Sequence, residues 1–344
     1  MGAETIISGR IWDGRQFDDG YMVICDEKIK EIVYGEISKE ADINGTILPG
    51  LVDTHTHVAD AGLKLGRKYS LEELVAPPGG LKHRYLKEAD PFDIHREMSD
   101  YIMRLELSGV SRFIDFRESG IEGVKLLKSV SSRATVLGRP TLKEYDPNEI
   151  DSILYRADGI GLPSITDMDH KYIDTVADHV KRKGKILALH VSERIREDID
   201  YVLSLDPDLI VHMVQATDSD LKRCADENVP VSVCPSSNLY FGMVPPVARM
   251  LDVGVDVCLG TDNAMLFPSA DIFSEARVLS GLLETQGKDP MSAYGILIAC
   301  GHKVLYHDPI TPHKTGSTAD ITVFPCSEDE LLKGNTKASA RYGP

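Results

Sequence analysis

The first 48 residues consist of short apolar runs separated by turn-forming residues. Four such runs are present, at residues 5–7, 21–25, 29–33 and 42–48. Pairs such as Asp13-Gly14 and Asn44-Gly45 separate them, and Gly, Asp and Asn are residues that tight turns favour. This segment is therefore predicted to form part of a small β-domain, and no catalytic residue is evident in it.

From Thr46 onward, strand-like apolar runs alternate with stretches of helical period. Eight strands are predicted, at residues 47–58, 112–116, 134–137, 159–162, 185–189, 209–211, 230–234 and 256–261. Helices are predicted at about 93–108, 120–130, 168–183, from Thr217 onward, 271–286 and 290–305. This alternation predicts an α/β fold, and its extent matches the roughly 250 residues of a (β/α)8 TIM barrel. An open doubly wound sheet is the alternative, which would spread the strand ends along a line rather than around a ring.

Two further segments complete the predicted organisation. Residues 59–91, which contain Pro77-Pro78, are predicted to form a long loop, and loops of this length are usually functional or disordered. Residues 315–324 read as a turn and a strand that return to the N-terminal β-domain. The predicted domains are residues 1–48 and 309–344 for the two parts of the β-domain, and residues 49–308 for the barrel.

Histidines and one aspartate stand at the carboxyl ends of the predicted strands. His55 and His57 are two residues apart, and alternate side chains on a strand point to the same face. This spacing alone is a weak signal, because surface strands show it too. However, later strands end at His190, His212 and Asp262. Because a barrel has its active site at this end of the strands, the five side chains are predicted to converge.

Three imidazoles and one carboxylate are a donor set for a borderline divalent ion. Zn²⁺ is favoured and Fe²⁺ is the alternative. The predicted ligands of the metal ion are His55, His57, His190 and Asp262, with a water in the remaining position. Such an ion lowers the pKa of its water toward about 7. A second ion would need another anionic ligand at the end of the fourth strand, typically a modified lysine. Residues 159–164 contain no lysine, so one ion is predicted.

Two residues near these ligands are predicted to move protons. Glu193 follows His190 by three residues, and a carboxyl group there could take a proton from water and return it to a departing nitrogen. The alternative is that Glu193 begins the next helix, where acidic residues are common. His212 could be a fifth ligand or could orient the water. Asp262 could serve as both ligand and base.

Composition narrows the classes of partner. The formal charge is −16 at pH 7, which argues against nonspecific binding of nucleic acid or anionic membranes. The sequence has no signal-peptide h-region and no apolar run long enough to span a bilayer. The six cysteines are scattered, without a Cys-x-x-Cys pair, and are expected to be thiols in a reducing compartment. A cytoplasmic protein is therefore expected.

Taken together, these motifs resemble the amidohydrolase superfamily. They are most similar to its branch of cytosine deaminase, adenosine-type deaminases and triazine hydrolases. The matching segments are residues 48–57, 190–193, 212, 234–239, 245–247, 259–263 and 319–324. The resemblance implies a barrel beside a composite β-sandwich built from both termini, and a single metal ion. It also implies that Glu193 shuttles protons and that His212 contacts the attacking water. This chain is shorter than typical members, so the second part of its β-sandwich is expected to be reduced.

Polar residues at the other strand ends and in the long loop are predicted to line the substrate pocket. The candidate substrate-binding residues are His83, Arg84, Arg117, Glu118, Arg139 and Asn238. Arg117 and Arg139 could hold a carboxylate or phosphate, or they could pair with Glu118 and Asp115 and join neighbouring strands.

The predicted function is deamination of a nitrogen heterocycle by a metal-dependent hydrolase acting on a small molecule. Opening of a cyclic amide or lactam is the second prediction, and a non-catalytic metal-binding barrel is the third. A homo-oligomer is compatible with the sequence.

Overall fold

The computed structural model describes residues 3–76, 79–306, 313–333 and 340–342. The chain divides into two compact units. One unit contains residues 1–52, 105–112 and 271–344, and the other contains residues 53–104 and 113–270. Pro77-Pro78 of the predicted long loop lie outside the described residues. The domain boundaries expected from the sequence stay a prediction.

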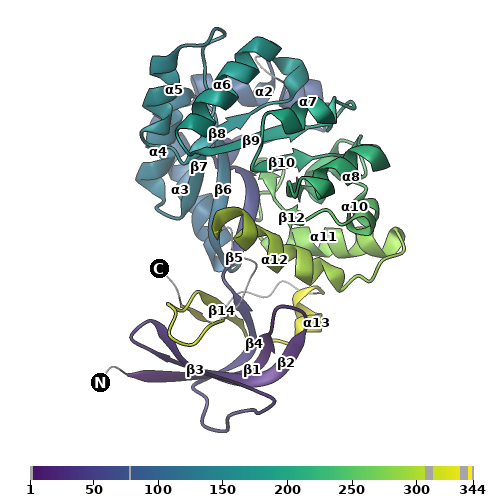
Figure 1. Ribbon diagram of the computed structural model, residues 1–344. Coiled ribbons are helices and arrows are strands. Elements are labelled where there is room, and N and C mark those ends of the chain that lie inside the picture. Colours follow the sequence, from purple (N-terminus) through teal and green to yellow (C-terminus); the bar gives the residue numbers. More distant parts are fainter. Residues whose placement is uncertain (1–2, 77–78, 307–312, 334–339, 343–344) are drawn as a thin grey trace. The chain divides into compact units, whose positions relative to one another are not determined.

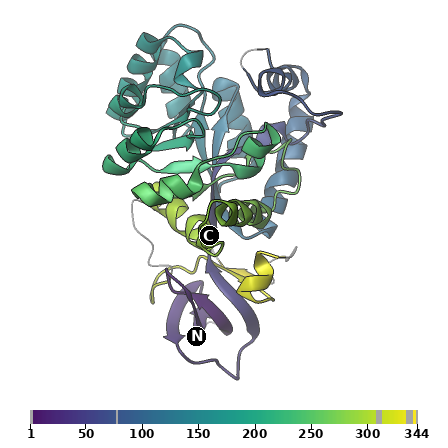
Figure 2. The ribbon, with the colours of Figure 1, turned by 90° about the vertical axis from the view of Figure 1, so that its right-hand side faces the viewer.

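The first unit contains a six-stranded sheet built from both ends of the chain. Its strands are β1 (Glu4–Trp12), β2 (Phe17–Cys25), β3 (Lys28–Tyr34), β4 (Ile43–Pro49), β14 (Ile321–Phe324) and β15 (Ala340–Tyr342), in the order β15-β14-β4-β1-β2-β3. Strand β14 pairs antiparallel with β4 and places Val323 opposite Ile47. Figure 2 shows the yellow C-terminal residues of this unit beside its purple N-terminal strands. The predicted return of the C-terminal strand is confirmed.

This sheet curls until its two sides meet. Lys28, the first residue of β3, forms an antiparallel bridge with Thr318, which lies just before β14. The curl encloses an apolar core to which alternate positions of the strands contribute, as expected for a sheet with one buried face. The buried members of this core are Ile7, Ile11, Met22, Ile24, Ile29, Ile47, Ala319, Ile321 and Val323.

The second sheet is the barrel. Its strands are β5 (Leu51–His57), β6 (Val110–Arg117), β7 (Ala134–Gly138), β8 (Gly159–Leu162), β9 (Ile186–Val191), β10 (Leu209–His212), β11 (Val231–Val233), β12 (Val257–Leu259) and β13 (Asp262–Asn263). Their order is β12-β11-β10-β9-β8-β7-β6-β5-β13. The predicted eighth strand is split, so that β12 pairs with β11 while β13 pairs with β5. The sheet therefore closes into the predicted (β/α)8 barrel, and the open sheet is excluded.

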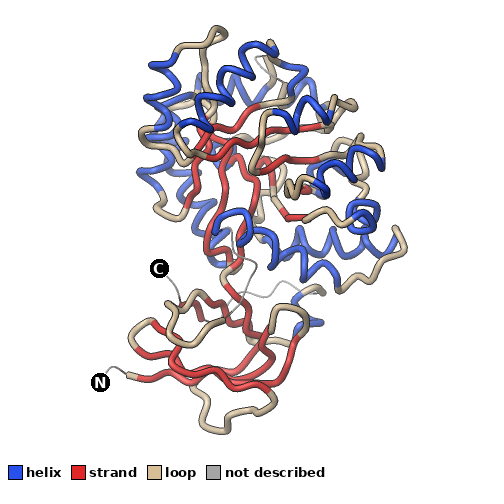
Figure 3. Tube along the Cα trace, viewed as in Figure 1, coloured by secondary structure: helices blue, strands red, loops and turns tan. Residues whose placement is uncertain are grey.

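Helices cover the outside of the barrel strands, as Figures 1 and 3 show for α4, α5 and α6. The helices of the described chain are α1 (Leu71–Leu74), α2 (Leu81–Glu88), α3 (Pro91–Leu107), α4 (Gly120–Val130), α5 (Pro147–Leu154), α6 (His170–Arg182), α7 (Ile199–Ser204), α8 (Asp218–Asp226), α9 (Pro235–Tyr240), α10 (Val247–Val253), α11 (Ile272–Thr285), α12 (Ser292–Tyr306) and α13 (Glu328–Leu331). The six predicted helices are confirmed, and Thr217 caps α8 as expected.

The predicted loop at residues 59–91 is wrong in one respect, because it contains α1 and α2. A capping box starts α1, since the Ser70 hydroxyl accepts from the Glu73 amide and the Glu73 carboxylate accepts from the Ser70 amide. The Ser-x-x-Glu spacing is a recognised start signal. The sequence therefore carried evidence for this helix, although α1 has only 4 residues.

The break between β12 and β13 brings strand eight very close to strand one. A Cβ atom on Gly260 would lie 2.7 Å from His55 Cβ and 2.9 Å from the His55 backbone nitrogen. Thr261 then fixes the crossing, because its hydroxyl donates to Asp53 Oδ2 at 2.6 Å and its amide donates to Asp53 Oδ1 at 3.1 Å. A residue with a side chain at position 260 would push His55 out of place.

Gly260→Ala is therefore expected to lower the free energy of unfolding by about 1–3 kcal/mol, the usual cost of overpacking. Urea denaturation measures this change. Gly281→Ala is the matched control, because a Cβ there meets nothing within 4 Å and the residue lies in α11. The control should raise stability by about 0.5–1 kcal/mol through helix propensity. Equal stability of the two variants would show that the close approach at Gly260 costs nothing.

The sequence also predicts that no segment spans a membrane and that the cysteines are thiols. None of the helices in the described ranges has both the length and the apolar character of a membrane span. Cys258 and Cys300 are disulfide-bonded, whereas the other four cysteines are not. The expectation of six thiols is therefore wrong, because spacing along the chain does not show which cysteines the fold brings within bonding distance.

Candidate active site

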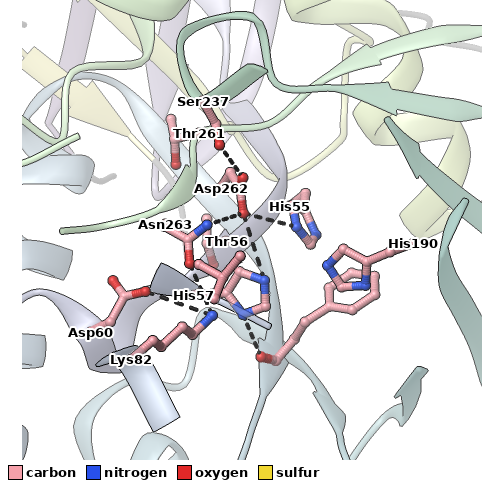
Figure 4. Close-up of polar contacts among 12 residues, drawn as sticks. His55, Thr56, His57, Asp60, Lys82, His190, Ser237, Thr261, Asp262 and Asn263 are labelled. Atoms are coloured by element: carbon pink, nitrogen blue, oxygen red, sulfur yellow. Dashed lines mark hydrogen bonds and ion pairs between the residues drawn. The ribbon is translucent and has the colours of Figure 1, made fainter. Parts of the chain in front are cut away.

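Four predicted ligand residues gather at the carboxyl ends of the barrel strands. His55 and His57 extend from β5, and His190 extends from β9. One ring nitrogen from each of these histidines lies within 4.8 Å of the others. The fourth residue, Asp262, belongs to β13 and pairs with Thr56, so that it faces the two histidines on either side of Thr56. Figure 4 shows the carboxylate between these two imidazoles.

Asp262 is held tightly in this position. Its Oδ1 atom lies 3.3 Å from His55 Nε2 and 3.6 Å from His57 Nε2. The Ser237 hydroxyl donates to Oδ2 at 2.5 Å, and Asn263 Nδ2 donates to Oδ1 at 2.9 Å. A carboxylate with these partners is fixed in orientation before any ligand arrives.

The Nδ1 atoms of two histidines form hydrogen bonds with backbone carbonyl oxygens of the barrel. His57 Nδ1 donates to the Phe116 carbonyl at 3.0 Å, and His190 Nδ1 donates to the Leu162 carbonyl at 2.9 Å. This arrangement leaves the Nε2 lone pair of each ring available. His55 is fully buried; its Nε2 atom lies 3.3 Å from Asp262 Oδ1, and its Nδ1 atom has no hydrogen-bond partner. Buried imidazole nitrogens without a partner are rare, and a metal ion would bind one nitrogen of this ring.

The protonation states also suit a divalent ion. Burial lowers the pKa of His55 to about 4 and that of His57 to about 3. Burial also lowers the pKa of His190 well below its usual value. Burial alone would raise the pKa of Asp262, but the contact with His55 and the charge of His212 hold it well below the ordinary range. Neutral imidazoles and a carboxylate are the forms that ligate zinc or iron.

A second cluster adjoins the first. His212, Cys234 and Asp262 each place a possible ligand atom within 4.8 Å of the other two. Cys234, at the end of β11, is a site residue that the sequence analysis did not single out. His212 and Asp262 have left-handed backbone conformations, with φ of 78° and 60°. Such conformations cost about 1–3 kcal/mol each and gather at functional sites.

Glu193 lies beside this cluster. Its Oε2 atom is 3.6 Å from His212 Nε2. Asn238 Nδ2 donates to Glu193 Oε1 and to His212 Nδ1, each at 3.3 Å. Glu193 lies in the loop before α7, which begins at Ile199, so the alternative that it starts a helix is wrong. Burial of the carboxyl group raises its pKa, as a group that exchanges protons near neutral pH requires.

Several of these side chains open onto one cavity. Of the predicted catalytic and ligand residues, His57, His190, Glu193, His212 and Asp262 line the cavity. Lys82, Asp167, Arg194 and Asn263 also line it, and these four were missed in the sequence analysis.

The candidate substrate-binding residues have different surroundings. Arg139 lines the cavity. Asn238 contacts Glu193 and His212 instead. His83 is absent from the cavity lining, because its Nε2 atom lies 3.0 Å from the Val75 carbonyl oxygen. Arg84 is exposed.

The two arginines at the ends of β6 and β7 differ in their partners. Arg117 Nη2 lies 2.7 Å from Glu118 Oε2, and its Nη1 atom lies 3.5 Å from Asp115 Oδ1. Arg117 therefore pairs with the two acidic residues that the structural alternative named, but these residues lie on β6 or directly after it, so the pairs do not join neighbouring strands. Arg139 has a buried Nε atom without a hydrogen-bond partner, and its guanidinium forms no ion pair with any described residue.

A family model and several known sequences match most of this chain. A model of the amidohydrolase family matches residues 46–324. An uncharacterised protein of Methanocaldococcus jannaschii is 33% identical over 296 residues, which cover 78% of this chain and 77% of that protein. A 5-methylthioadenosine/S-adenosylhomocysteine deaminase of Halothermothrix orenii is 27% identical over 361 residues, which cover 90% of this chain and 81% of that protein.

Solved structures share the fold. Aminofutalosine deaminase of Helicobacter pylori, in complex with methylthio-coformycin, has a TM-score of 0.75 at 18% identity, and the match covers 97% of both chains. An adenosine deaminase of Xanthomonas campestris with bound zinc has a TM-score of 0.72 at 16% identity, covering 93% of this chain and 84% of that chain. The zinc in that structure lies in a fold similar to this one.

Proposed function

The chain belongs to the amidohydrolase family and is a hydrolase of C–N bonds, and from this premise we propose that it deaminates a nitrogen heterocycle. One observation carries the proposal. Three imidazoles lie within 4.8 Å of one another, Asp262 contacts two of them, and His57, His190 and Asp262 line the same cavity as Glu193, a carboxyl group with a raised pKa. A metal-storage barrel would need the ligands but would not need the acid beside them.

The proposed ligands are His55, His57, His190 and Asp262. A divalent ion bound there would lower the pKa of a water toward about 7 and so supply a nucleophile at neutral pH. Zn²⁺ is the favoured ion, and Fe²⁺ is the alternative. His55 has a strong case as a ligand, since it is fully buried and its Nδ1 atom has no hydrogen bond to give up.

Glu193 is the proposed proton carrier. Water adds its oxygen to the ring carbon that bears the amino group, and Glu193 takes a proton from that water. The net reaction places one water proton on the ring nitrogen and the other on the amino group, which leaves as ammonia. Asn238 donates to Glu193 and holds the carboxyl group over the cavity.

His212 is proposed to orient the water. Asn238 Nδ2 donates to His212 Nδ1, which directs the Nε2–H of His212 toward Glu193, 3.6 Å away. A donor at that point would hold the water between His212 and Glu193. The left-handed backbone at His212 turns the imidazole away from the strand direction and toward the cavity.

Arg139 is proposed to bind an anionic group of the substrate. Its guanidinium lines the cavity without an ion-pair partner among the described residues, whereas the neighbouring Arg117 is paired. An unpaired cation that is partly buried is costly unless a ligand compensates it. A substrate that carries a carboxylate or phosphate at a distance from its heterocycle would provide that compensation.

Arg139→Met is expected to raise KM for anionic substrates about 10–100-fold, because a charged hydrogen bond contributes about 1.5–3 kcal/mol. The value of kcat should change little. Steady-state kinetics on an anionic substrate and its neutral analogue measure the difference. Arg156→Met, at an exposed position, is the matched control. An equal rise in KM for both substrates would argue against recognition of an anion.

The proposed function is tested with a panel of compounds and protein loaded with Zn²⁺ or Fe²⁺. Aminated purines, pyrimidines and triazines, with and without an anionic substituent, should release ammonia. Cyclic amides of similar size form the second arm. A ring-opened product without ammonia would favour the alternative reaction of the family, and loaded protein that acts on neither group would contradict both.

A further inference from the structure

A buried lysine lies beside the candidate metal ligands. Lys82, in α2, is 3% exposed. Its Nζ atom is 2.7 Å from Glu118 Oε1 and 3.7 Å from Asp60 Oδ2, and it donates to Asn263 Oδ1 at 3.0 Å. Figure 4 shows the Lys82 nitrogen between Asp60 and Asn263, on the side of the ligands away from His190.

Two neighbours of Lys82 each contact a different candidate ligand. Glu118 Oε1 lies 2.9 Å from His57 Nδ1, so Lys82 and His57 share one carboxylate oxygen. Asn263 Nδ2 donates to Asp262 Oδ1 at 2.9 Å, so the same amide joins Lys82 and Asp262. One ammonium group thus supports two ligands that come from opposite ends of the barrel sequence.

This arrangement is sensitive to the loss of the lysine. Glu118 is 4% exposed and Asp60 is 1% exposed, and removing one partner of a buried charge pair leaves the other uncompensated. Glu118 would keep Arg117, whose Nη2 atom lies 2.7 Å from its Oε2, but the oxygen that faces His57 would lose its cation. The side-chain amide of Asn263 would lose the donor that fixes its orientation.

We propose that Lys82 is a positioning residue that holds His57 and Asp262 in a single orientation for metal binding. Because Lys82 is carried by α2, docking of this helix brings the ammonium group to the partners of these two ligands. The inference rests on the metal site of the proposed function. The inference does not depend on which substrate the enzyme uses.

The first experiment measures metal affinity of Lys82→Met by competition with a chelator. Outer contacts to metal ligands are typically worth 10–100-fold in affinity or activity, and a weakening of about this size for Zn²⁺ is expected. The visible spectrum of the Co²⁺-loaded variant should also change, since it reports ligand geometry. Lys87→Met is the matched control, because Lys87 is an exposed lysine of the same helix. Wild-type affinity and spectrum in Lys82→Met would overturn the proposal.

The second experiment separates positioning from a general effect on folding. Asn263→Ser leaves the Lys82–Glu118 contact in place and interrupts only the path to Asp262. It should weaken Zn²⁺ binding, and the double variant with Lys82→Met should lose less than the sum of the two single losses. Strictly additive losses would mean that the two residues act independently, against the proposal. If Lys82→Met does not fold, an unchanged Co²⁺ spectrum in Asn263→Ser would itself overturn it.

Chemical rescue distinguishes a role of the ammonium group from a purely structural role of the side chain. Lys82→Ala leaves space where the side chain was, and added ethylammonium should restore part of the Zn²⁺ affinity, whereas ethanol should not. Absence of rescue in a folded variant would count against a role for the ammonium. Wild-type protein that binds no divalent ion would instead refute the proposed function, so the two failures are distinguishable.

Discussion

Asp262→Ala is expected to yield a protein that retains no divalent ion and has no measurable turnover. The Asp262 carboxylate is the only anionic donor among the four proposed ligands, and it lies within 3.6 Å of Nε2 of both His55 and His57. A bound metal ion supplies several kcal/mol of catalysis. Since each 1.36 kcal/mol corresponds to a factor of ten in rate, the loss should reach about a thousandfold or more.

Metal content of the purified variant, measured together with its rate of ammonia release, checks this result. His55→Ala should behave in the same way, because its ring is one of the three imidazoles of the proposed donor set and lies 3.3 Å from Asp262 Oδ1. Asp178→Ala is the control, since Asp178 is an exposed carboxylate of α6 and its loss should change neither quantity. A stoichiometric metal ion in Asp262→Ala would remove this residue from the donor set.

Glu193→Gln is expected to separate metal binding from catalysis. The substitution preserves size and leaves an oxygen that can accept from Asn238, but the amide cannot carry a proton between water and nitrogen. Metal content should equal that of the wild type. Turnover should fall about 10²–10⁴-fold, the usual contribution of a general acid–base group.

Single-turnover kinetics on metal-loaded protein measure this loss without interference from product release. Glu284→Gln, at an exposed position in α11, controls for the general effect of the substitution. Normal turnover in Glu193→Gln would assign the proton transfer elsewhere, and His212 or Asp262 would then be the first residues to examine. Loss of metal in the variant would instead make Glu193 a structural partner of the site.

The barrel and the gathering of the candidate ligand residues could be predicted because both follow from short-range rules. Period-two alternation places His55 and His57 on one face of a strand, and parallel strands of a barrel bring their carboxyl ends together. His190 and Asp262 are thereby gathered without any knowledge of side-chain packing. The closure of the ring by β13 could not be predicted, because it depends on Gly260 allowing strand eight to cross beneath His55.

Lys82, one of the residues missed in the sequence analysis, depends on how the segment between β5 and β6 folds. His83 and Arg84 were predicted to bind substrate, but the neighbouring Lys82 lines the cavity instead. The choice is made by the rotation of α2, and a helix turns by about 100° per residue. Which face of such a short helix is buried depends on contacts with Asp60, Glu118 and Asn263, and those contacts are far away in the sequence.

The split eighth strand has a consequence for the order in which the protein matures. His55 and His57 leave the ribosome more than two hundred residues before Asp262, and the carboxylate reaches them only when β13 pairs with β5. A nascent chain that has not yet made this last pairing lacks a full donor set. Assembly of the proposed metal site therefore waits until the last barrel strand has been made and has paired with β5.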